Sequence, residues 1–285
     1  MKLGTFSPEI SAGSTEELFQ KAKDYGFSQM QFDYESAGIE EMPEFVPDSL
    51  NQEIANEAVR NEIEIVAVNG TFNMAHPDLA VRKDGIERFE KIAASCSTFA
   101  CELVTLCTGS RNRQNMWVPH ADNNTPEAWK DMVTVMEQLI LTADEYNIYL
   151  GIETEASNVI NTAQKARRLI DELKSPRLKI ILDAANLFQP GMAKRGKVQG
   201  VIAEAFELLG PWITLAHGKD IKEGEGIAFA NAGKGIIDFH FFLEELEEIG
   251  YKGGMILHGI KQEKDIPECV DYMKKIAGNF NTFRN

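Results

Sequence analysis

Long apolar runs are absent from this sequence. No stretch of about 18 consecutive apolar residues occurs, so a membrane-spanning helix is not expected. Cysteine is scarce: Cys96, Cys101, Cys107 and Cys269 include no CxxC pair, which predicts buried thiols of the kind found in cytoplasmic proteins. The first ten residues also lack the apolar stretch of a signal peptide, so we expect a cytoplasmic protein.

Positive charge is in short supply as well. Lys and Arg number 29 against 44 Asp and Glu, which gives a formal net charge of −15. An acidic chain repels phosphate backbones, and the sequence offers no local basic face that would overcome this. Neither a nucleic acid nor a membrane is therefore an expected partner.

What the chain does contain is a regular alternation of strand-like and helix-like segments over all 285 residues. Eight repeats of about 36 residues, with no visible linker, predict a single (β/α)8 TIM barrel as one domain, 1–285. Strands are expected over 2–6, 27–35, 64–74, 102–109, 149–155, 179–183, 213–220 and 253–260. Helices are expected near 15–25, 49–61, 79–99, 126–146, 197–209, 237–250 and 266–277, with one more between the fifth and sixth strands.

Four consecutive predicted strands each end in a possible metal ligand. These residues are Glu153, Asp183, His217 and His258, and they lie 30, 34 and 41 residues apart, close to one βα repeat each. Alternate side chains of a strand face opposite ways, and the strand positions place all four on the same side. Since ligands of α/β folds bind at the carboxyl ends of strands, we expect the four side chains to converge there.

Two carboxylates and two imidazoles suit a divalent cation such as Mn²⁺, Mg²⁺, Zn²⁺ or Co²⁺. Such an ion can chelate a sugar carbonyl and its neighbouring hydroxyl, and so ease removal of a proton from the α-carbon. A nearby carboxylate would move that proton, with Glu153 and His258 as the catalytic candidates. Glu155 is either a second base or a supporting group.

Candidates for holding the substrate lie in loops at the same end. The loop 110–126 is longer than an ordinary βα connection and carries Arg111, Trp117 and His120. Asn186 follows Asp183 by three residues, and Lys219 follows His217 by two. Lys219 could equally pair with Asp220.

The stretch AGKG at 232–235 superficially suggests phosphate binding. It matches neither GxGxxG nor a GKS/T pattern, so a tight turn before a helix is the better interpretation.

The sequence resembles the sugar phosphate isomerase/epimerase group of xylose-isomerase-like TIM barrels. The resemblance rests on LGIETEASNVINT, LDAAN, AHGKD, GKGIIDFHFFLEELEEIGYKGG and TGSRNRQNMWVPHADNNTPEAW, and it covers nearly the whole chain. It implies that Glu153, Asp183 and His217 are metal ligands. The family usually has a glutamate as fourth ligand and second base where this chain has His258. Asn186 stands where the epimerases have a substrate-binding histidine.

We therefore expect a divalent-metal-dependent isomerase or epimerase that abstracts a proton α to the carbonyl of a sugar or sugar derivative. The alternatives are an inosose-type dehydratase and a non-catalytic carbohydrate-binding barrel, the latter kept open by the change to His258. Endonuclease activity is disfavoured by the acidity and by only five histidines. The expected partner is a small-molecule carbohydrate, and a homo-oligomer is compatible with the sequence.

Overall fold

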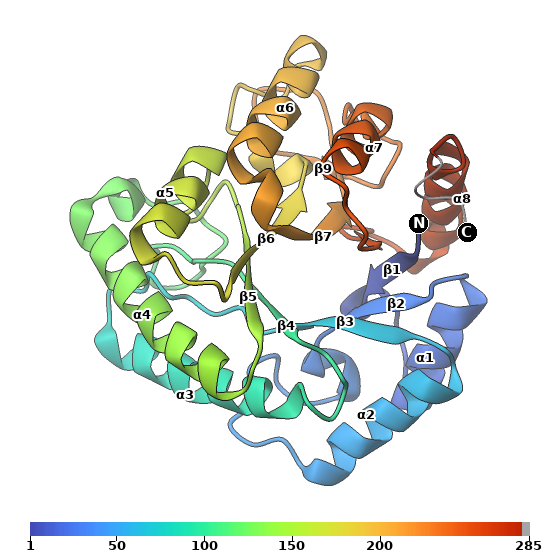
Figure 1. Ribbon diagram of the computed structural model, residues 1–285, viewed down its shortest axis with the longest axis horizontal. Coiled ribbons are helices and arrows are strands. Elements are labelled where there is room, and N and C mark those ends of the chain that lie inside the picture. The colour runs from blue at the N-terminus through green and yellow to red at the C-terminus, as the bar shows by residue number, and fades with distance from the viewer. Residues whose placement is uncertain (281–285) are drawn as a thin grey trace.

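Short apolar segments of the sequence form a closed barrel of parallel strands with helices outside it (Figure 1). The computed structural model describes residues 1–280. Around the barrel the strand order is β1-β10-β7-β6-β5-β4-β3-β2. The strands are β1 (Leu3–Phe6), β2 (Gln29–Phe32), β3 (Glu64–Asn69), β4 (Leu103–Leu106), β5 (Tyr149–Glu153), β6 (Leu178–Asp183), β7 (Ile213–Gly218) and β10 (Met255–Leu257). The predicted (β/α)8 TIM barrel is confirmed.

Eight α-helices alternate with these strands in the described residues. They are α1 (Thr15–Asp24), α2 (Asp48–Arg60), α3 (Leu79–Ser95), α4 (Pro126–Glu145), α5 (Ala163–Leu173), α6 (Val198–Leu209), α7 (Phe239–Glu248) and α8 (Ile266–Ala277). Local sequence fixes several of their starts. The hydroxyl of Thr125 accepts a hydrogen bond from the Ala128 amide, and Pro126 occupies the first position of α4.

The inside of the barrel is filled by alternate strand residues, as the strand positions predict. Ala67, Leu103, Ile181, Leu215 and Ile256 form a buried cluster separate from the larger core between strands and helices. The interior leaves no room for another side chain at β5, because a Cβ on Gly151 would lie 2.8 Å from Ile181 Cδ1. This packed layer forms a floor beneath the polar residues at the strand ends.

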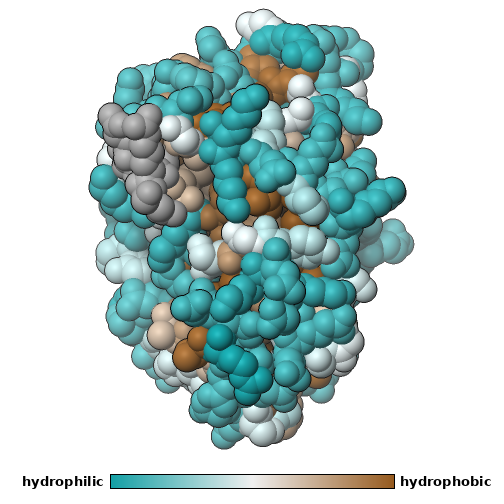
Figure 2. All heavy atoms as spheres, turned by 90° about the vertical axis from the view of Figure 1, so that its right-hand side faces the viewer, coloured by the Kyte–Doolittle hydropathy of each residue, from teal (hydrophilic) through white to brown (hydrophobic). Residues whose placement is uncertain are grey.

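The four cysteines are buried and form no disulfide, as predicted. Within residues 1–280, none of the helices has the length and hydrophobicity needed to span a membrane. Figure 2 shows the side of the molecule on which α1 and α8 lie, and hydrophilic residues make up most of that surface.

A small antiparallel pair in the loop after β7 was not predicted. It consists of β8 (Asp220–Ile221) and β9 (Phe229–Ala230). Two-residue strands carry no periodicity in the sequence, and this pair depends on side-chain contacts that form only in the folded loop.

The buried carboxylate of Asp220 organises this loop. It accepts hydrogen bonds from the backbone amides of Ile221, Gly233, Gly235 and Ile237. The AGKG stretch is therefore wrapped around an internal carboxylate as a turn before α7.

Candidate metal centre and pocket

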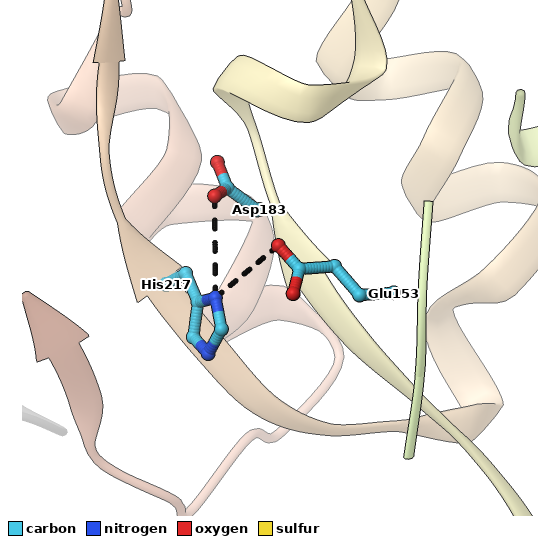
Figure 3. Close-up of side chains that lie close together, drawn as sticks. All are labelled: Glu153, Asp183 and His217. Atoms are coloured by element: carbon cyan, nitrogen blue, oxygen red, sulfur yellow. Dashed lines mark ion pairs between the residues drawn. The ribbon is translucent and has the colours of Figure 1, made fainter. Parts of the chain in front are cut away.

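Three side chains from neighbouring strands converge at the carboxyl end of the barrel. Glu153 ends β5, Asp183 ends β6 and His217 lies in β7, and all three are buried. His217 Nδ1 lies 3.4 Å from Glu153 Oε1 and 3.9 Å from Asp183 Oδ2 (Figure 3). One ligand atom of each residue lies within 4.8 Å of the others, so this group could hold a metal ion.

The orientation of the His217 ring is set from across the barrel. Its Nε2 lies 2.8 Å from Oε1 of Gln31, on β2. A carbonyl oxygen only accepts hydrogen bonds, so Nε2 carries the hydrogen. In the neutral ring, which is the form that binds a metal, Nδ1 then presents its lone pair to the two carboxylates.

His217 Nδ1 and Asp183 Oδ2 are buried and lack a hydrogen-bond partner among the described residues. A lone pair facing two buried carboxylates is unfavourable unless a cation lies between them. The distances of 3.4 and 3.9 Å exceed a hydrogen bond from a ring nitrogen. They suit ligands that share one ion, which lie about 3–4 Å apart when each bond is about 2.1 Å. The donor set therefore fits a divalent metal.

Two further side chains balance the charge of the carboxylates. Lys219 Nζ forms an ion pair of 3.0 Å with Asp183 Oδ2, although the geometry is not that of a hydrogen bond. Asn186 Nδ2 donates to Glu153 Oε1 at 2.6 Å. Burial alone would raise the pKa of Glu153. When the His217 ring is protonated, as it can be without a metal, its charge and that of Lys219 outweigh burial and lower the pKa of Glu153 below its usual range.

His258 follows β10 and lies beside the three-residue group. Its ring meets the His217 ring edge to face, with centroids 5.2 Å apart. Its Nδ1 lies 3.2 Å from Oε1 of Glu9, a residue of the loop after β1. In residues 1–280 the group of ligand atoms within 4.8 Å comprises Glu153, Asp183 and His217, so metal ligation by His258 stays a prediction.

A pocket of about 240 Å³ opens beside this group. Glu153 and His258 contribute to its wall, and Trp117 reaches it from the long loop after β4. Its other lining residues are Phe6, Pro8, Gln31, Asp33, Glu35, Glu41, Asn69, Thr71, Thr105 and Cys107. A larger cavity of about 480 Å³ lies at the opposite end of the barrel, but it contains none of the converging ligands. Because (β/α)8 enzymes place their chemistry at the carboxyl ends of strands, we assign the site to the smaller pocket.

Residues 19–276 match the model of one protein family, described as the xylose isomerase-like TIM barrel. The chain belongs to this family. The resemblance noted in the sequence is confirmed, and no curated protein matches the chain.

Solved structures share the fold at low identity. A D-tagatose 3-epimerase-like protein superposes with a TM-score of 0.77 at 19% identity, covering 99% of this chain and 98% of its own. The probable 3-DHS dehydratase AsbF from Bacillus anthracis gives 0.73 at 17%, with 96% and 99% covered. The IOLI protein with a binding zinc atom also gives 0.73 at 17%, with 99% and 100% covered.

Of the three predicted substrate-binding residues in the loop 110–126 of this xylose isomerase-like barrel, Trp117 lines the pocket, whereas Arg111 and His120 bond to other residues. Trp117 lines the pocket and is half exposed. The guanidinium of Arg111 instead pairs with Asp131 at 2.7 Å and donates to the carbonyl of Ala75. His120 is exposed and caps a short helical turn by accepting from the Asp122 amide. Substrate contacts by Arg111 and His120 stay predictions.

Sequence reasoning missed the polar residues that β2 and β3 contribute to the site. Gln31 orients His217, and Asn69 Nδ2 donates to both Asp33 Oδ2 and Glu41 Oε1, at 2.7 Å each. A signal was present for this strand: Gln31 and Asp33 share one face of the predicted strand 27–35. Nothing in the sequence indicates that Glu41, from a loop, folds back to Asn69.

Replacing Gln31 with Met should weaken metal binding by about 10–100-fold, because the His217 ring would lose the acceptor that fixes its orientation. Titration of the metal-free protein with Zn²⁺ or Mn²⁺ measures this. Gln52→Met is the control, since Gln52 is exposed on α2 and its side-chain amide donates to Asn56 on the same helix. Equal affinities in the two variants would show that Gln31 does not support the metal centre.

Proposed function

We propose that this protein is a divalent-metal-dependent enzyme that isomerises or epimerises a sugar or sugar derivative through proton abstraction α to a carbonyl. The observation that carries the proposal is the unpartnered Nδ1 of His217, buried and directed at Glu153 and Asp183. Glu153, Asp183 and His217 would hold Mn²⁺, Mg²⁺, Zn²⁺ or Co²⁺. The bound ion would polarise the substrate carbonyl and stabilise the negative charge that develops on its oxygen.

Glu153 is the proposed base. It lines the pocket, where a bound substrate would meet it, and its carboxylate is in the ionised form that a base requires. Asn186 holds one of its oxygens at 2.6 Å, which fixes the carboxylate relative to the pocket.

His258 is the proposed second acid/base group, or a fourth ligand. Both reactions take a proton from one position and return it to another position or to the other face, so two groups are useful. His258 lines the same pocket as Glu153, and Glu9 holds its Nδ1. The ring is thereby held at the wall of the pocket.

The substrate proposed is a small carbohydrate. Trp117 offers an aromatic wall, and Lys219 and Asn186 position the acids of the site. The predicted roles of Arg111 and His120 in holding substrate belong to this proposal as well, through movement of the loop 110–126.

A dehydratase is the second candidate. The same proton abstraction can be followed by loss of a β-hydroxyl, and an imidazolium at His258 would supply the proton to the leaving group. The two reactions differ in the product: dehydration removes the mass of one water, whereas isomerisation and epimerisation leave the mass unchanged.

The first experiment measures metal content by elemental mass spectrometry in wild type and His258→Ala. We expect near-stoichiometric metal in wild type. Loss in the variant makes His258 a ligand, and retention makes it an acid/base or substrate contact. Wild type that takes up no metal, even with added Mn²⁺ or Zn²⁺, would contradict the proposal and favour a non-catalytic binding barrel.

The second experiment incubates the metal-loaded protein with ketoses, aldoses and inososes in D₂O. Proton abstraction should place solvent deuterium on the carbon next to the carbonyl, detected by NMR. Metal-loaded protein that exchanges no hydrogen in any of these sugars would count against proton abstraction as the reaction.

A further inference from the structure

The loops after the seventh and eighth barrel strands frequently bind phosphate in (β/α)8 enzymes, through backbone amides. In this chain those loops follow β7 and β10. Whether their amides are available bears directly on which substrates can bind.

The amides after β7 are already taken by a carboxylate of the chain itself. Asp220 Oδ2 accepts from Gly233 at 3.1 Å and from Gly235 at 2.9 Å, and Oδ1 accepts from Ile221 at 2.8 Å and Ile237 at 2.9 Å. These amides also leave no space for a second group, because a Cβ on Gly235 would lie 2.2 Å from Asp220 Oδ1. An anion site of backbone amides thus exists here, with Asp220 as its occupant.

The loop after β10 has the same arrangement with a different acid. Oε1 of Glu9 accepts from the backbone amides of Gly259 and Ile260, the latter at 3.1 Å, and also contacts His258. The side chain of Glu9 is only 8% exposed. Its carboxylate would have to leave before a phosphate could use these amides.

The pocket itself is negative. Besides the proposed metal ligand Glu153, whose charge the ion would offset, Asp33, Glu35 and Glu41 line it, and its lining includes neither Lys nor Arg. The buried ammonium of Lys219 pairs with Asp183. A phosphate dianion would meet like charges here, whereas sugar hydroxyls could donate to these carboxylates.

We propose that this pocket takes a neutral, unphosphorylated sugar, and that Asp220 and Glu9 fill the two sets of amides that a phosphate would otherwise use. The proposal rests on the proposed function and specifies its substrate class. Phosphate esters are rejected both by the occupied amides and by the acids on the pocket wall.

The test compares D-fructose with D-fructose 6-phosphate, and D-glucose with D-glucose 6-phosphate, using the metal-loaded full chain. Calorimetry measures binding, and NMR in D₂O measures exchange at the carbon next to the carbonyl. We expect the free sugar of at least one pair to bind or exchange, with a preference over its phosphate of at least about tenfold.

The pocket charge is tested separately with Glu41→Lys, because Glu41 lines the pocket and is an exposed residue. The replacement loses the hydrogen bond from Asn69, which keeps its second acceptor, Asp33. This change should reduce the preference for free sugar by about tenfold. The control is Glu87→Lys, which makes the same change of charge on the exposed face of α3, outside the pocket, and should leave the preference as in wild type.

Two results would overturn the inference, and they differ in what they imply for the proposed function. A phosphate ester that is preferred over its free sugar contradicts the inference alone and leaves the isomerase proposal standing. Metal-loaded protein that exchanges hydrogen in none of the four sugars, and in none of the wider set of ketoses, aldoses and inososes, removes the proposed function and the inference with it. An equal effect of Glu41→Lys and Glu87→Lys would show that long-range charge, not the pocket wall, sets the preference.

Discussion

Glu153→Gln is expected to keep the fold and to lose catalysis of hydrogen exchange by about 10²–10⁴-fold in kcat. Glutamine fills the same volume on β5 and can still meet Asn186 through its carbonyl oxygen. It cannot accept a proton at neutral pH, so the chemical step loses its base. The measurement is the rate of deuterium incorporation from D₂O into the best substrate.

Loss of metal must be separated from loss of the base, because Glu153 is proposed for both roles. The variant should therefore be assayed at saturating metal, with bound metal measured on the same sample. Glu102→Gln is the matched control, since Glu102 is exposed at the opposite end of the barrel. Activity of metal-loaded Glu153→Gln close to that of the control would remove Glu153 from the catalytic role.

Asp183→Ala should lower the free energy of unfolding of the metal-free protein by about 3–5 kcal/mol. Asp183 is fully buried, and the ammonium of Lys219, itself 5% exposed, pairs with it at 3.0 Å. Removal of the carboxylate leaves a buried charge without its closest partner, and this costs more than the ion pair contributes. Urea denaturation in the presence of a chelator measures the difference.

The double variant Asp183→Leu, Lys219→Met separates the charge effect from a packing effect. Two apolar side chains of similar size remove both charges together, so most of the lost stability should return. The double variant should still fail to bind metal, because one ligand is missing. A double variant as unstable as Asp183→Ala would show that the cost arises from packing around residue 183.

Strand residues were predictable from the sequence because a strand has only two faces. Glu153 and Asp183 end their buried strands and His217 is the second-last residue of β7, so the alternation of strand faces placed all three on the inward side. The layer beneath them is apolar, as expected. Ile181 and Leu215 lie two positions before Asp183 and His217, and Ile256 lies on the neighbouring strand β10.

Loop residues were not predictable in the same way. Loops lack a repeating geometry, so the position of Arg111 depends on the single carboxylate of Asp131 that it meets in the folded state. Glu9 is a clearer case. It lies in the first βα loop, yet its partners are 249, 250 and 251 residues away, and no local pattern encodes such a contact.

The barrel can close only late in synthesis, because its first and last strands must pair. β1 pairs with β10, with Leu3 opposite Met255, and closing a loop of this length costs about 5 kcal/mol in chain entropy. Until residue 257 has been synthesised, the sheet has two open edges. β1 forms one of these edges, because it can pair with β2 but not yet with β10. The strands that carry Glu153, Asp183 and His217 are complete at residue 218, which is 39 residues before the end of β10 at residue 257. The three candidate ligands are therefore synthesised before the barrel can close. Glu9 forms its hydrogen bonds across the junction of β1 and β10 once the last strand has been synthesised.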